Sequence, residues 1–138
     1  MRDIVLDEDI QVAGISISLV LKAHALKERA VGKGKDAYDI VWSLMAHPDG
    51  PAAAGREFAE RAVDEFRSNH RTQSLAIIRR RFADDERGAG VRKEGPTLYA
   101  AFLTEEQSGA AFQRRRQEAS IVVAQFINAA DEAMSPKR

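Results

Sequence analysis

The feature that most limits the possible folds of this chain is a pair of helical patterns separated by a glycine turn, within residues 22–40. Before the turn, apolar residues recur at the four- and three-residue spacings of one helix face. They are Leu19, Ala23, Leu26 and Ala30. Gly32 and Gly34 can adopt the left-handed backbone that ends a helix. A second helix is expected to start near Asp36, whose carboxylate suits the positive end of a helix dipole. Its apolar stripe consists of Ala37, Ile40, Val41 and Leu44.

Charged side chains lie on both sides of this turn. Lys22 and Arg29 are seven residues apart and project in similar directions, while Asp36 and Asp39 are three apart and can face the same way. Lys35 adds basic charge beside them. In one interpretation, ion pairs brace the helical hairpin, each exposed pair contributing about 0 to 1 kcal/mol. In the other, the bases bind the phosphate oxygens of a ligand, for which lysine and arginine have the right charge. The spacing alone favours the brace.

The pattern around the turn resembles a known family. It consists of Lys22, Ala25, Arg29, Lys35, Asp36, Tyr38, Asp39 and Ile40. It is similar to the helical region that follows the catalytic sheet in AbiEii-type nucleotidyltransferases, the toxin-like proteins of some toxin–antitoxin systems, and covers about twenty of the 138 residues. The resemblance implies a cytoplasmic bacterial protein related to enzymes that transfer a nucleotide from a nucleoside triphosphate, with Mg²⁺, to an acceptor. It also implies that Lys22 and Asp36 border the nucleotide pocket, with Arg29, Lys35 and Asp39 supporting them.

The catalytic motifs of that family are not found in this sequence. Such enzymes carry a Gly-Ser turn and then a pair of acids that hold Mg²⁺ against the triphosphate. No glycine here is followed by serine, and the triplet Asp7-Glu8-Asp9 has only six residues before it. We therefore expect no catalytic or metal-binding residues, with Mg²⁺ and nucleoside triphosphate implied by the resemblance alone. The expected function is the C-terminal helical portion of an AbiEii-like nucleotidyltransferase, inactive as an isolated chain.

The alternative hypothesis is a non-enzymatic interaction module. It would bind an antitoxin, a separate catalytic subunit or RNA, or form an oligomer. For RNA, the candidate contacts are Arg79, Arg80 and Arg81, whose charges suit backbone phosphates. No aromatic side chains are interleaved with them on the same helix face, so an ordinary charged surface is the favoured interpretation of these arginines.

Composition limits the class of protein. The chain has 138 residues, 44% of them apolar, which suits one domain with one core. Its 21 basic and 21 acidic side chains cancel, so only a local patch can attract nucleic acid. Cysteine is absent, and no apolar run approaches the roughly 20 residues of a membrane helix. These features fit a cytoplasmic protein that does not bind membranes.

We predict a mostly α-helical single domain over residues 1–138, a bundle of about five helices with a small N-terminal β-hairpin. The hairpin is expected in residues 1–14, the charged helical hairpin in 15–47, and the remaining helices in 52–134 with a loop at 84–96. Thr104 is expected to cap the last helix, and Trp42 to anchor its helix against neighbours. The inward residues of the later helices are predicted to be Phe58, Leu75, Ile78, Phe82, Phe112, Ala119, Val123, Phe126 and Ala130.

Overall fold

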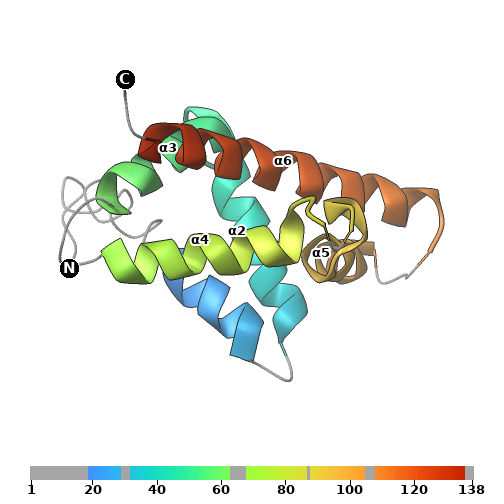
Figure 1. Ribbon diagram of the computed structural model, residues 1–138. Helices are drawn as coiled ribbons and strands as arrows, with labels where there is room; N and C mark the ends of the chain where they lie inside the picture. Colours follow the sequence, from blue (N-terminus) through green and yellow to red (C-terminus); the bar gives the residue numbers. More distant parts are fainter. Residues whose placement is uncertain (1–18, 29–31, 63–67, 87, 105–107, 136–138) are drawn as a thin grey trace, which may run out of the picture.

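The computed structural model describes residues 19–28, 32–62, 68–86, 88–104 and 108–135, and these residues are mostly helical (Figure 1). Helical residues 19–28 come first. They are followed by α2 (Lys33–Met45), α3 (Gly50–Ala62), α4 (Ser68–Phe82), the 3₁₀ turn η1 (Gly90–Arg92), α5 (Glu94–Thr104) and α6 (Ala110–Met134). The predicted helical bundle is confirmed. Within the described ranges the only β pairing is one isolated bridge between Asp85 and Gly88. The hairpin predicted for residues 1–14 lies outside them.

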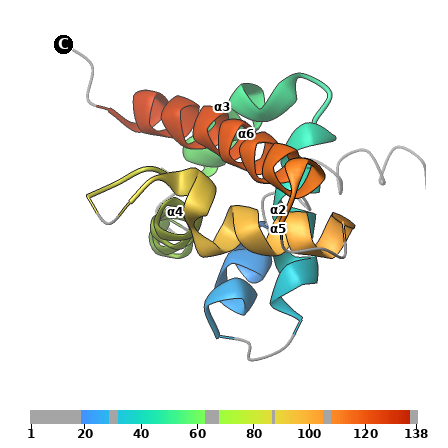
Figure 2. The same cartoon turned by 90° about the vertical axis from the view of Figure 1, so that its right-hand side faces the viewer.

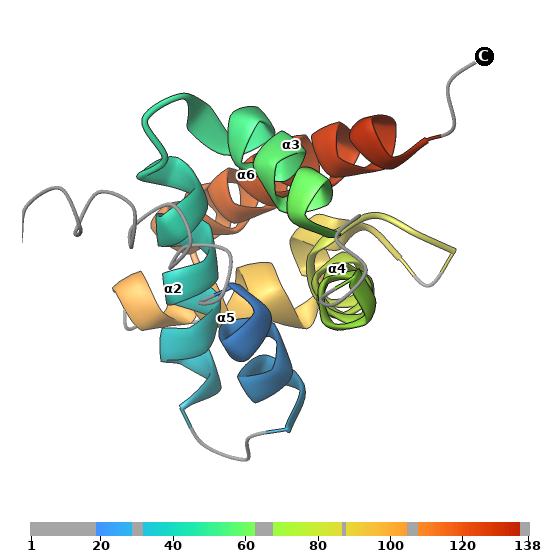
Figure 3. The same ribbon diagram turned by 90° about the vertical axis from the view of Figure 1, so that its left-hand side faces the viewer.

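Helix α6, the longest described helix, is the spine of the bundle. It packs most extensively on α3 and α5, and it also contacts α2, α4 and η1. Figure 2 shows α6 crossing above α5, with α4 seen nearly end-on beside them. Helix α2 packs mainly on α5, and residues 19–28 lie beside α2 and below α4 (Figure 3).

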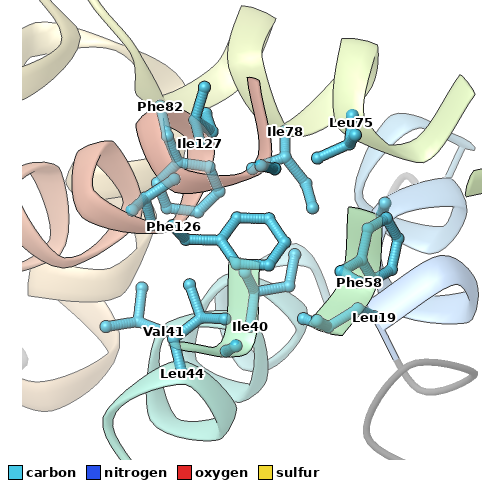
Figure 4. Packing of buried hydrophobic residues seen from close by; sticks show 14 of the residues in the cluster. Leu19, Ile40, Val41, Leu44, Phe58, Leu75, Ile78, Phe82, Phe126 and Ile127 are labelled. Carbon is cyan, nitrogen blue, oxygen red and sulfur yellow. The ribbon is translucent and has the colours of Figure 1, made fainter. Parts of the chain in front are cut away.

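The apolar stripes predicted from the sequence converge on one core. Phe126 of α6 lies at its centre, between α2 on one side and α4 on the other (Figure 4). The rings of Phe58 and Phe126 meet edge to face with centroids 5.6 Å apart. Fully burying a side chain of this size contributes roughly 1.5–3 kcal/mol before entropy is counted. The predicted core positions that are buried include Leu19, Ala23, Leu26, Ala37, Ile40, Val41, Leu44, Phe58, Leu75, Ile78, Phe82, Phe112, Ala119, Val123, Phe126 and Ala130.

A glycine sets the close approach of α3 to α6. A Cβ built on Gly55 would lie 2.2 Å from the carbonyl oxygen of Phe126, a backbone atom that cannot rotate away. Any larger residue at position 55 must therefore push the two helices apart. The sequence contains no local signal for this contact, because the partner is on a helix far along the chain.

Three local predictions are wrong. Trp42 is 53% exposed, because Ile40, Val41 and Leu44 take the buried face of α2 and leave the indole on the other side. The predicted loop at 84–96 is shorter, since η1 and the start of α5 fall within it. Thr104 is not the N-cap of α6, which is Gly109: it is the last residue of α5, and its hydroxyl donates to the carbonyl of Ala100.

Gly32 has the predicted left-handed backbone, but Gly34 lies within α2, because the second helix starts earlier than predicted. Helix α2 begins at Lys33 rather than near Asp36, directly after Gly32, whose φ of 85° is left-handed. Asp36 therefore lies in the first turn of α2, which keeps its carboxylate near the positive end of the helix dipole.

Candidate functional site

The structure brings four of the predicted site residues together where residues 19–28 meet α2. Lys22 Nζ lies 3.5 Å from Asp36 Oδ1 and 3.0 Å from Asp39 Oδ2. Lys35 Nζ lies 3.1 Å from the same oxygen of Asp39. We call Lys22, Lys35, Asp36 and Asp39 the charge junction. The fifth residue, Arg29, lies outside the described residues.

Burial differs sharply across the charge junction. The side chain of Asp36 is fully buried, with 0% of its surface exposed, whereas those of Lys22 and Asp39 are partly exposed and that of Lys35 is mostly exposed. An ionised carboxylate out of contact with water is tolerated only when it is paired and hydrogen-bonded. Lys22 supplies that partner from the neighbouring helix, so the pair fixes one helix against the other.

The pKa directions favour charged forms at this junction. Burial alone would raise the pKa of Asp39, but hydrogen bonds from Lys22 and Lys35 outweigh it and hold that pKa below its ordinary value. The hydrogen bond to Asp39 raises the pKa of Lys22 against the opposing effect of burial. Both groups therefore stay ionised at neutral pH, which suits an ion pair rather than an exchange of protons.

The junction can position helices more readily than it can hold a metal. Each described acid in it already faces a lysine ammonium. In the part of the chain that the structure describes, no three His, Cys, Asp or Glu side chains gather in a way that could hold a metal ion. The distances thus agree with the brace, the interpretation that the spacing favoured.

The three candidate arginines of α4 do not act as one surface. Arg79 makes two hydrogen bonds to the Asp131 carboxylate of α6, at 2.8 and 2.5 Å, and this pairing raises its pKa. Arg81 Nη1 lies 2.8 Å from Glu94 Oε1, and the other oxygen of Glu94 accepts from Lys33 at 3.2 Å. Arg80 alone is exposed, without an ion pair among the described residues.

One partly buried polar pair had no signal in the sequence. The Tyr99 hydroxyl donates to Glu118 Oε1 at 2.6 Å, and Arg115 Nη1 lies 2.9 Å from the same oxygen. Burial, and then this hydrogen bond, raise the pKa of Tyr99 well above its usual range. The pair joins α5 to α6 across nineteen positions of sequence, a separation at which helical spacing carries no information.

Comparison with known proteins adds no family to this description: protein-family models, curated proteins and solved structures all show no significant match to the chain. Among the described helices, none is both long enough and apolar enough to cross a membrane.

Proposed function

We propose that this chain is the helical portion of an AbiEii-like nucleotidyltransferase and that these 138 residues do not transfer a nucleotide on their own. The observation that carries the proposal is the charge junction. Lys22, Lys35, Asp36 and Asp39, which the family resemblance singles out from a short stretch of sequence, meet within 3.0–3.5 Å in space.

Within this proposal the junction has a positioning role. Lys22 links the buried Asp36 and the partly exposed Asp39, so it fixes the angle between residues 19–28 and α2. A fixed helix pair can present a constant surface to a catalytic half that holds Mg²⁺ and the triphosphate. The acids of the junction are neutralised by lysines, so metal binding and transfer are assigned to that catalytic half.

The second candidate is an interaction module without a nucleotidyltransferase relationship. It is favoured by apolar side chains that α2 and α5 leave exposed, namely Trp42, Met45, Phe102 and Leu103. The two helices are in contact here, since the rings of Tyr38 and Phe102 have centroids 5.2 Å apart. Exposed aromatic and methionine side chains are enriched in protein interfaces, so this candidate favours a protein partner over RNA.

The experiment that tests the proposal is reconstitution. An AbiEii-type enzyme truncated to its catalytic half is assayed for transfer of label from α-³²P nucleoside triphosphates with Mg²⁺, alone and with this chain added. We expect no transfer by this chain alone and an increase when the two are mixed. Transfer by this chain alone would overturn the proposal. A mixture no more active than the catalytic half, with no complex on size-exclusion chromatography, would leave the interaction module as the better description.

A further inference from the structure

A basic hollow lies between residues 19–28 and α4, away from the charge junction. It has a volume of about 400 Å³, and it is lined by His24, Lys27, Gln73, Ala76, Ile77, Arg80 and Arg81. Residues 19–28 lie next to α4 and slope away from it (Figure 1, Figure 3). The lining positions 73, 76, 77 and 80 of α4 follow the spacing of a single helix face. This wall of the hollow is therefore formed by one face of a helix and not by a loop.

The charges of the hollow are of one sign and are partly unused. No aspartate or glutamate is among its described lining residues. Lys27 and Arg80 are exposed and make no ion pair within the described part of the chain, and Arg81 is held by Glu94. A cluster of cations without acids attracts an anion, and arginine and lysine are the usual partners of phosphate oxygens.

A second observation also points to a ligand. His24 Nε2 is buried, and it has no hydrogen-bond partner in the described structure. Buried polar atoms without partners are rare in folded proteins, because each costs free energy. His24 is one of the residues that line the hollow, so a rotation of its ring would let an oxygen of a bound anion supply the missing partner.

The shape of the basic surface favours a small ligand over a nucleic acid strand. A protein that follows a polynucleotide needs a groove of cations along the backbone. On α4 that line is interrupted, because Arg79 is neutralised by Asp131 and Arg81 by Glu94. The volume of the hollow instead falls within the range of small-molecule sites, and Ala76 and Ile77 give it an apolar wall beside the polar Gln73.

We propose that this hollow binds a small organic phosphate, with Lys27, Arg80 and His24 holding the phosphate oxygens and Ile77 contacting the organic part. The proposal is independent of the nucleotidyltransferase relationship, because its residues lie outside the charge junction.

The test uses the whole chain and three probes: inorganic phosphate, adenosine 5′-monophosphate and adenosine. Binding is followed by NMR titration of backbone amide and arginine side-chain resonances. We expect phosphate in the millimolar range to shift resonances of His24, Lys27 and Arg80. The monophosphate should bind more tightly than phosphate, and adenosine at least tenfold more weakly than the monophosphate, because only the phosphate ester meets the cations.

The matched variants are Arg80→Ala and Arg56→Ala, which each remove one exposed arginine from a helix. Arg80→Ala should weaken monophosphate binding about tenfold, the effect of losing one charge-assisted hydrogen bond, with Arg80→Lys intermediate and Arg56→Ala unchanged. Equal weakening by Arg80→Ala and Arg56→Ala, or no shift with phosphate or the monophosphate, would overturn the proposal. Tighter binding of a short single-stranded RNA, with shifts spread along exposed basic residues, would replace it with a polynucleotide surface.

Discussion

Lys22 Nζ lies 3.5 Å from Oδ1 of Asp36, a carboxylate with no exposed surface. The two residues are fourteen positions apart, on helices joined by a glycine turn. Lys22 therefore places a cation beside an aspartate inside the bundle, and it pairs with Asp39 at the same time.

Replacing this lysine should destabilise the fold. Lys22→Met keeps the aliphatic stem but removes the charge shared by Asp36 and Asp39. We expect the free energy of unfolding to fall by on the order of 2–3 kcal/mol, less than for a fully buried pair because Lys22 is partly exposed. Urea denaturation measures it. Lys27→Met, an exposed and unpaired lysine of the same helix, is the control and should change stability by no more than about 0.5 kcal/mol.

Acid should weaken the charge junction. The pKa of Asp39 is lower in the folded chain than its ordinary value of 3.8, so the unfolded state binds more protons as the pH falls. The stabilisation by Asp39 is complete at pH values above its ordinary pKa, and it is lost as the pH drops through the pKa of the folded chain. Asp39→Asn should therefore show a shallower loss of stability below about pH 5 than the wild type, measured by thermal melts at a series of pH values. Parallel curves for the two proteins would show that Asp39 carries no such linkage.

Replacing two different glycines by alanine should affect the stability of the fold differently. Gly55→Ala places a Cβ against the Phe126 backbone oxygen and should cost about 1–3 kcal/mol or more, because α3 and α6 must separate. Gly34→Ala places a Cβ at an ordinary 3.5 Å from the Phe102 ring, inside α2. Alanine is favoured over glycine by roughly 0.5–1 kcal/mol in the middle of a helix. Gly34 is in the first turn of α2, so this variant should be neutral or slightly more stable. Circular dichroism melts measure both, and a well-tolerated Gly55→Ala would argue against the close α3–α6 contact.

The hydrogen bond between Tyr99 of α5 and Glu118 of α6 should contribute moderately to the stability of the fold. Tyr99→Phe removes the hydroxyl that donates to Glu118 at 2.6 Å, while Arg115 remains beside that carboxylate. We expect a loss of about 1–2 kcal/mol in the free energy of unfolding, the range for a hydrogen bond to a charged group. Tyr38→Phe serves as the comparison in urea denaturation. Losses of equal size in both variants would mean that the Tyr99 hydroxyl contributes nothing specific.

Much of the fold follows from the sequence because its helices are amphipathic over several turns. The stripe of Ile40, Val41 and Leu44 is buried as its spacing predicts, and the same periodicity places Phe126 in the core. The charge junction was also predictable, since its acids are three residues apart and the glycine turn returns the chain toward Lys22.

What could not be predicted depends on which helices meet. Arg79 and Asp131 pair across 52 positions, and Glu94 joins Lys33 to Arg81, so the arginine triplet of α4 appeared more available than it is. The anchor predicted for Trp42 is wrong because its neighbours fill the buried face of α2. His24 and Lys27 line a hollow together with residues of α4, a contact that their own stretch of sequence does not indicate.

The most direct test of the positioning role compares the melting temperatures of the wild type, Asp36→Asn and Arg80→Ala, each with and without ATP and Mg²⁺. A ligand that binds only the folded state raises the melting temperature. We expect Asp36→Asn to melt at a lower temperature than the wild type, because the Asp36 carboxylate braces the helices. The rise caused by ATP should stay the same, because ATP is expected to bind in the basic hollow and Asp36 contacts no phosphate there. Arg80→Ala should melt normally and lose most of the rise. An Asp36→Asn variant with unchanged melting temperature and no Mg²⁺-dependent rise would contradict the brace and make the charge junction a nucleotide site.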